Sequence, residues 1–109
     1  MPRKKIVQTV GDKKLKDYEL VYILSPDMTD EALETRINGM STFITSREGT
    51  IDAVDKWGKK RLAYPIKHFQ DGNYILTKFK MSPGHCKELE ANLRISEDIV
   101  RHLLIRVNS

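Results

Sequence analysis

The sequence contains a single cysteine, Cys86, and it has no long run of hydrophobic residues. A lone cysteine excludes an internal disulfide, a four-cysteine iron–sulfur site and a structural zinc cluster, so we expect Cys86 to fill space in the core. No apolar segment approaches the ~18 residues that a membrane-spanning helix needs. After the basic start, the apolar segment at 6–10 is too short for the secretory hydrophobic region of about 7–15 residues. These absences predict a cytoplasmic protein.

Patterns typical of catalysis and of metal binding are also missing. The three histidines, His68, His85 and His102, fall in three different expected elements, and none has the spacing of a metal-binding pair such as H-E-x-x-H. There is no internal repeat and no low-complexity tract. We therefore expect a binding protein rather than an enzyme, without a cofactor, a metal or a small-molecule substrate.

The charge of the chain is unevenly distributed. The 109 residues, 39% hydrophobic and 31% charged, suffice for one domain with one core, and the net charge is +4. Residues 1–16 carry six basic side chains and one acid, and we expect a flexible basic arm there, followed by a folded domain at 17–109. Residues 56–68 hold five basic side chains and no acid, whereas 27–48 hold five acids and two arginines. Such asymmetry can guide one face toward phosphate groups.

Hydrophobic periodicity predicts the first strand and the first helix. Residues 18–24 place apolar side chains on both faces of a strand, which is typical of the centre of a sheet. Thr29 is a good N-cap, and the acidic residues Asp30 and Glu31 suit the first turn of a helix. Apolar residues then recur at helical spacing until Gly49, which is expected just after the end of the helix.

The middle of the chain predicts a hairpin. Residues 51–67 read as a long irregular strand with a bulge at Gly58, and Pro65 assigns that strand to a sheet edge because proline cannot donate a hydrogen bond. Asp71-Gly72 predicts a tight turn before a partner strand at 74–81.

The remaining elements complete a known arrangement. Ser82 and Pro83 begin a second helix, and residues 99–107 form the last strand. The order strand, helix, strand, strand, helix, strand predicts an α+β, ferredoxin-like split βαβ fold, with two helices on one face of a four-stranded antiparallel sheet. The other face and the sheet edges are then available for function.

Several short motifs together resemble one family. The stretch KWGKKRLAYPIK, from Lys56 to Lys67, resembles the signature stretch of the family of the sixth protein of the bacterial small ribosomal subunit. Its flanks agree in order: Tyr18-Glu19 with an apolar strand and Ser25-Pro26, then Gly72-Asn73-Tyr74, then Val100-Arg101-His102-Leu103. The resemblance covers about residues 17–108. Typical members begin almost directly at the first strand, so it gives no role to the arm.

The resemblance implies a structural, non-catalytic constituent of the small subunit. Such a protein binds the central domain of small-subunit ribosomal RNA together with the eighteenth protein of that subunit. The predicted RNA-binding residues are Lys56, Lys59, Lys60, Arg61, Tyr64, Lys67 and Arg101. The predicted partner-binding residues are Trp57, His102 and Arg106.

Each of these assignments has a simpler alternative. The basic stretch is also what an edge strand uses to block aggregation, although the resemblance favours RNA contact. Trp57 and Tyr64 are able to stack on unpaired bases, but a packing role is favoured for Trp57. For His102, exposure to solvent without any partner explains the sequence about as well as partner contact does. Arg101, in contrast, matches the family pattern.

Three other functions fit the same topology. An RNA-recognition-motif protein needs an aromatic run on its third strand, and GNYILTKFK lacks it. A small enzyme such as an acylphosphatase needs a glycine-rich phosphate loop where this chain has the acidic SPDMTDE. A regulatory domain that dimerises through its sheet stays open.

Overall fold

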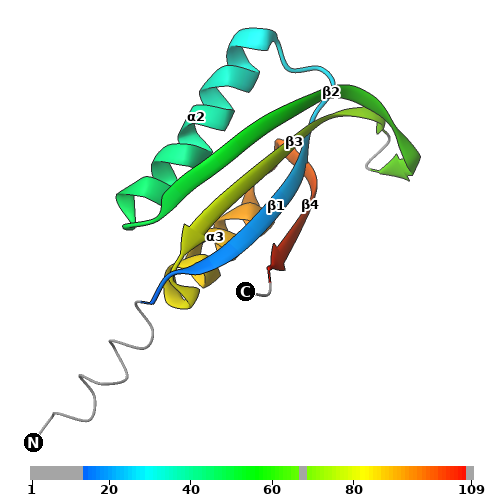
Figure 1. Cartoon of the computed structure of the whole chain (residues 1–109). Helices are drawn as coiled ribbons and strands as arrows, with labels where there is room; N and C mark the ends of the chain where they lie inside the picture. The colour runs from blue at the N-terminus through cyan, green and yellow to red at the C-terminus, as the bar shows by residue number, and fades with distance from the viewer. Residues whose placement is uncertain (1–13, 67–68, 108–109) are drawn as a thin grey trace, which may run out of the picture.

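The computed structural model describes residues 14–66 and 69–107, with side chains for all of these except 63–66. The elements are β1 (Lys16–Leu24), α2 (Asp30–Ser46), β2 (Thr50–Ile66), β3 (Phe69–Met81), α3 (Pro83–Ile95) and β4 (Ile99–Arg106). The strands form one antiparallel sheet in the order β2-β3-β1-β4, and both helices lie on the same face of it (Figure 1). This is the ferredoxin-like α+β fold that the sequence predicted. Neither helix in the described ranges is long and apolar enough to cross a membrane.

β1 is a central strand, as its apolar residues predicted. It pairs with β3 along one side and with β4 along the other. Leu20, Tyr22 and Leu24 are completely buried beneath the helices, while Ile23 is buried on the opposite, helix-free face. The predicted arm lies outside the described residues except for its last three, and β1 begins at Lys16.

The two helices begin as predicted. The Thr29 hydroxyl accepts a hydrogen bond from the Ala32 N–H (3.1 Å) at the start of α2, and Ser82 caps α3 with proline in its first turn. Each helix buries one apolar stripe against the sheet. Cys86 belongs to the stripe of α3 and is only 6% exposed, so its role as core filler is confirmed; burial raises the pKa of its thiol.

The end of α2 differs from the prediction. α2 ends at Ser46, and the backbone reverses at Glu48 (φ 65°), so the expectation that Gly49 takes this position was wrong. The Glu48 N–H donates to the Thr45 carbonyl (3.1 Å) and the Gly49 N–H to the Ile44 carbonyl (2.9 Å), which is a Schellman motif. Gly49 is required for space instead, because a Cβ there would lie 2.8 Å from the Ile44 oxygen.

The predicted turn at Asp71-Gly72 was also wrong. Both residues lie inside β3, where Asp71 pairs with Arg61, and the two strands are joined between Ile66 and Phe69. A dipeptide typical of turns therefore continues as a strand, because pairing with β2 extends past it. The consequence is a β2–β3 ribbon, made of residues 56–66 of β2 and 69–75 of β3. Its far end extends well beyond the helices (Figure 1). The edge position of β2 and the bulge at Gly58 (φ 86°) are confirmed.

Candidate nucleic-acid interface

The bulge on β2 divides the basic stretch between the two faces of the sheet. The register shifts between Lys56 and Gly58, so that Lys56 lies opposite Ile75 and Lys59 opposite Asn73, on the side of the helices. Lys60 lies opposite Gly72 on the helix-free face. Because side chains alternate along a strand, the cations do not form one flat patch but surround the ribbon.

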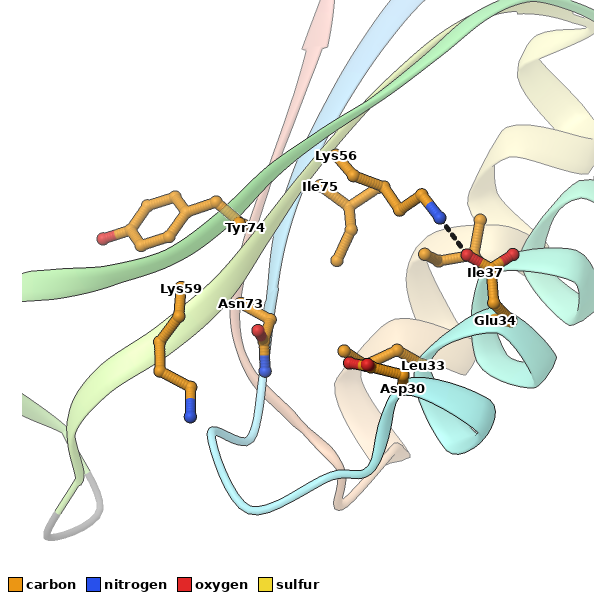
Figure 2. A pocket seen from close by; sticks show the side chains of 10 residues that line it. Asp30, Leu33, Glu34, Ile37, Lys56, Lys59, Asn73, Tyr74 and Ile75 are labelled. Atoms are coloured by element: carbon orange, nitrogen blue, oxygen red, sulfur yellow. Dashed lines mark hydrogen bonds and ion pairs between the residues drawn. The ribbon is translucent and has the colours of Figure 1, made fainter.

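On the helix side, the ribbon and α2 enclose a groove of about 520 Å³. Leu33, Ile37 and Ile75 line it together with the charged Lys59, and Lys56 forms an ion pair with Glu34 at its rim (Figure 2). This pair is half exposed, so it is worth no more than about 1 kcal/mol and is easily exchanged for another anion. Lys56 is thus partly neutralised in the free protein, unlike its basic neighbours.

On the helix-free face, three side chains of the ribbon form an aromatic and cationic cluster. The rings of Trp57 and Tyr74 are stacked, with centroids 6.3 Å apart and planes at 19°. The Lys60 ammonium lies 5.9 Å from the centre of the Trp57 ring. Trp57 packs on a neighbour, as the packing alternative proposed, yet it remains 45% exposed.

The free positive charge of the ribbon is concentrated towards its tip. Lys59, Lys60 and Arg61 are exposed, and within 14–66 and 69–107 no carboxylate forms an ion pair with any of them. Lys67 and the side chain of Tyr64, both predicted RNA contacts, lie outside the described residues.

At the opposite end of the helix-free face, acidic side chains are neutralised by lysines of the sheet. Lys80 bridges Asp52 (3.0 Å) and Asp17 (3.3 Å), and its hydrogen bonds to these two carboxylates raise its pKa. Glu19 lies next in this region, opposite Lys78. The sheet therefore has one end whose charges are paired with each other and one end whose cations have no carboxylate partner among the described residues.

The other predicted residues lie on β4 and point to opposite faces of the sheet. Arg101 lies opposite Ile23 on the helix-free face, whereas His102 and Arg106 lie opposite Tyr22 and Tyr18 on the helix side. The predicted partner-binding set is thus divided, because Trp57 belongs to the helix-free face and to the other edge of the sheet.

The sequence analysis missed an apolar strip on β4. Leu103 and Ile105 are 56% and 45% exposed on the helix-free face, beside the half-buried Val21. Their alternation was visible in the sequence, but it did not reveal that no helix covers this side. Within the described ranges, no group of three or more His, Cys, Asp or Glu side chains is placed to hold a metal ion.

Comparison with known proteins identifies the family. The family model described as ribosomal protein S6 matches residues 17–106, nearly the whole folded domain. The chain belongs to the ribosomal protein S6 family. This confirms the resemblance found in the sequence and the predicted location on the small ribosomal subunit in the cytoplasm. Membership of a family of structural ribosomal proteins also agrees with the expectation that this chain is not an enzyme.

Individual members of the ribosomal protein S6 family match over most of their length. The small ribosomal subunit protein bS6 of Moorella thermoacetica is 38% identical over 93 residues, which cover 85% of this chain and 95% of that protein. The protein of the same name from Carboxydothermus hydrogenoformans is 40% identical over 92 residues, 84% and 96% of the two chains. The crystal structure of 30S ribosomal protein S6 from Thermotoga maritima superposes with a TM-score of 0.81 at 30% identity, over 86% of this chain and 89% of that one.

Proposed function

We propose that this chain is a structural constituent of the bacterial small ribosomal subunit that binds the central domain of its ribosomal RNA, beside the eighteenth protein of that subunit. It catalyses no reaction. The observation that carries the RNA contact is the ribbon, where Lys59, Lys60 and Arg61 are exposed and, among the described residues, have no carboxylate partner.

The alternation of these three cations suits folded RNA better than a flat anionic surface. Lys60 lies on one side of the ribbon and its two neighbours on the other, so a ribbon placed between two phosphate backbones meets both of them. At the opposite end of the sheet Lys80 is already bound by Asp17 and Asp52, so it offers less attraction to phosphate. The difference between the two ends orients the protein with the ribbon towards the RNA.

The outer edge of β4 has the features expected of a binding site for the protein partner. Leu103 and Ile105 leave apolar surface exposed on one side of this edge strand, while His102 and Arg106 offer polar groups on the other. Exposed apolar side chains with a polar rim are typical of protein interfaces. A neighbour that covers this edge contacts both sides of the strand.

A salt titration tests the RNA contact. Each phosphate contact contributes about −0.7 to −0.9 to the slope of log affinity against log salt concentration. Replacing Lys59, Lys60 and Arg61 by alanine should therefore weaken binding to a central-domain transcript and flatten the slope by about 2 to 3 units. A matched control removes the same charge elsewhere, at Lys78, Lys87 and Arg94, and should leave most of the slope in place. Equal effects of the two triple variants would refute a specific role for the ribbon.

A gel shift with and without the eighteenth protein tests the partner. Affinity for the transcript should rise when that protein is added. The double substitution Leu103→Ser and Ile105→Ser should abolish this gain. It should not change the affinity for the transcript when the eighteenth protein is absent. An affinity that does not respond to the second protein removes the cooperative part of the proposal and leaves the RNA contact intact.

A further inference from the structure

We propose that Trp57 is a stacking site for an unpaired RNA base, with Tyr74 as its support and Lys60 as the cation beside it. This assignment rests on the proposed RNA-binding function and names the ligand class of one part of that surface. It also moves Trp57 from the predicted partner-binding residues to the RNA-binding ones.

The Trp57 ring is supported on one side and accessible. It stacks on Tyr74 with centroids 6.3 Å apart and planes at 19°, and 45% of the residue remains exposed. A large, rigid aromatic ring that is half exposed beside a lysine ammonium is the kind of surface on which proteins stack unpaired bases. Because stacking needs only a π-face, such a site accepts any of the four bases.

The support beneath the ring is itself fixed. Tyr74 packs against a second small core on the helix-free face, formed by Ile23, Leu62 and Val100. Figure 2 shows the Tyr74 side chain directed away from α2, opposite to its neighbour Ile75. Because this core holds Tyr74 in place, the Trp57 ring is largely ordered before RNA arrives, and little conformational entropy is lost on binding.

The backbone positions Trp57 next to the cation. The bulge places Trp57 and Gly58 where β3 offers only Tyr74, and Gly58 adopts the positive φ (86°) that this geometry requires. Lys60 then lies on the same face, with its ammonium 5.9 Å from the ring centre. This distance is at the outer limit of a cation–π contact, so the contact is weak and the ammonium is free to meet the phosphate of the stacked nucleotide.

The surroundings favour RNA over a protein partner. The exposed apolar residues Leu103 and Ile105 lie on β4, at the opposite edge of the sheet and about three strand spacings, or ~14 Å, from β2. Lys60 and, on the other side, Asp55 share this face of β2 with Trp57, and the centre of a protein interface is usually depleted in both lysine and aspartate. Aromatic rings beside lysines are instead what single-stranded RNA binders combine.

The fluorescence of Trp57 reports on the site directly, because the chain contains one tryptophan. The full-length protein is titrated with a central-domain transcript, with a short unstructured RNA, and with an abasic strand of equal length and charge. We expect quenching by the first two and none by the abasic strand, which should bind more weakly. Quenching of equal size by the abasic strand overturns the proposal, because no base is then needed.

Two variants separate stacking from charge and from stability. Trp57→Leu should weaken binding of the unstructured RNA about 5- to 100-fold without changing the salt slope, whereas Trp57→Phe keeps a ring and should retain most of the affinity. Ile95→Ala, a control that removes an exposed apolar side chain from the end of α3, should have no effect on RNA affinity. Circular dichroism confirms that each variant is folded.

The remaining outcomes distinguish this proposal from the proposed function. If RNA binds with the expected salt slope but the fluorescence does not change, Trp57 does not stack and the RNA-binding function stands. If the fluorescence changes only when the eighteenth protein is added without RNA, Trp57 is a partner contact and the stacking proposal is refuted. If neither RNA binds at all, the proposed function itself fails.

Discussion

Gly72 on β3 lies so close to Ile23 on β1 that a Cβ at position 72 would stand 2.2 Å from the Ile23 Cγ2 atom. Gly72 is buried and sits in the middle of a strand pairing, opposite Lys60. The glycine is therefore needed for the close packing of the helix-free face rather than for a turn.

Gly72→Ala should destabilise the fold by about 1–3 kcal/mol, because the β-branched Ile23 has little room to move. Urea unfolding followed by circular dichroism measures this. Gly39→Ala provides the control, since a Cβ there meets nothing within 4 Å and alanine favours the interior of α2. It should raise stability by up to about 1 kcal/mol. Equal stability of the Gly72→Ala variant and the wild type would contradict the close packing.

Glu48→Gly should stabilise the protein by up to about 1 kcal/mol. Glu48 has a φ of 65°, a left-handed conformation that is unfavourable for a residue with a Cβ and free of strain for glycine. Thermal unfolding should show a higher midpoint. Glu48→Ala removes the same charge but keeps the Cβ, so it should show no such gain; a similar gain in both variants would attribute the effect to charge instead.

Arg36→Ala should cost about 1–2 kcal/mol of stability. The Arg36 Nε lies 2.8 Å from the Asp98 Oδ2, and its Nη2 donates to the Ser96 Oγ at 2.9 Å, so one side chain joins α2 to the loop between α3 and β4. The matched control is Arg94→Ala, which loses only the exposed 3.7 Å pair with Glu90 and should cost at most about 0.5 kcal/mol. Comparable losses in denaturant titrations would contradict a special role for Arg36.

Alkaline pH should destabilise the protein through Tyr22. Burial raises the pKa of Tyr22 from 10.0 to about 12, because the folded core disfavours the charged phenolate. Folding therefore favours the neutral phenol over the phenolate. The resulting contribution to the stability of the fold is complete below pH 10 and is lost as the pH rises from about 10 to about 12. Thermal midpoints across this range should fall less steeply in Tyr22→Phe, which keeps the ring and removes the ionising group. Parallel curves would exclude Tyr22 as the cause.

The order of the elements could be predicted from the sequence because each one carries local signals. The apolar residues on both faces of 18–24 indicate a central strand, and the caps at Thr29 and Ser82 mark where the helices begin. The failures arise where distant contacts decide. Asp71-Gly72 is typical of a turn, but pairing with β2 and packing against Ile23 hold it in a strand.

The candidate site was predictable in its residues and not in its geometry. The run from Lys56 to Lys67 indicated a basic edge, but the side of the sheet on which each cation lies depends on the bulge before Gly58. Neither the pairing of Lys56 with Glu34, far along the chain, nor the packing of Trp57 on Tyr74 has a local signal. The first depends on how α2 packs over β2 and the second on the register between β2 and β3, and only the folded protein fixes these.

The unequal lengths of the strands have a dynamic consequence. The pairing between β1 and β3 ends at Asn73, so among the described residues the part of β3 from Phe69 to Gly72 is bonded to β2 alone. A two-stranded ribbon is only marginally stable by itself, and its amide protons should exchange with solvent long before those of β1. The segment that carries Lys60 and Arg61 is thus joined to the body through the packing of Leu62 and Phe69 on Ile23 and Val100 rather than through a third strand, while the four-stranded body stays rigid.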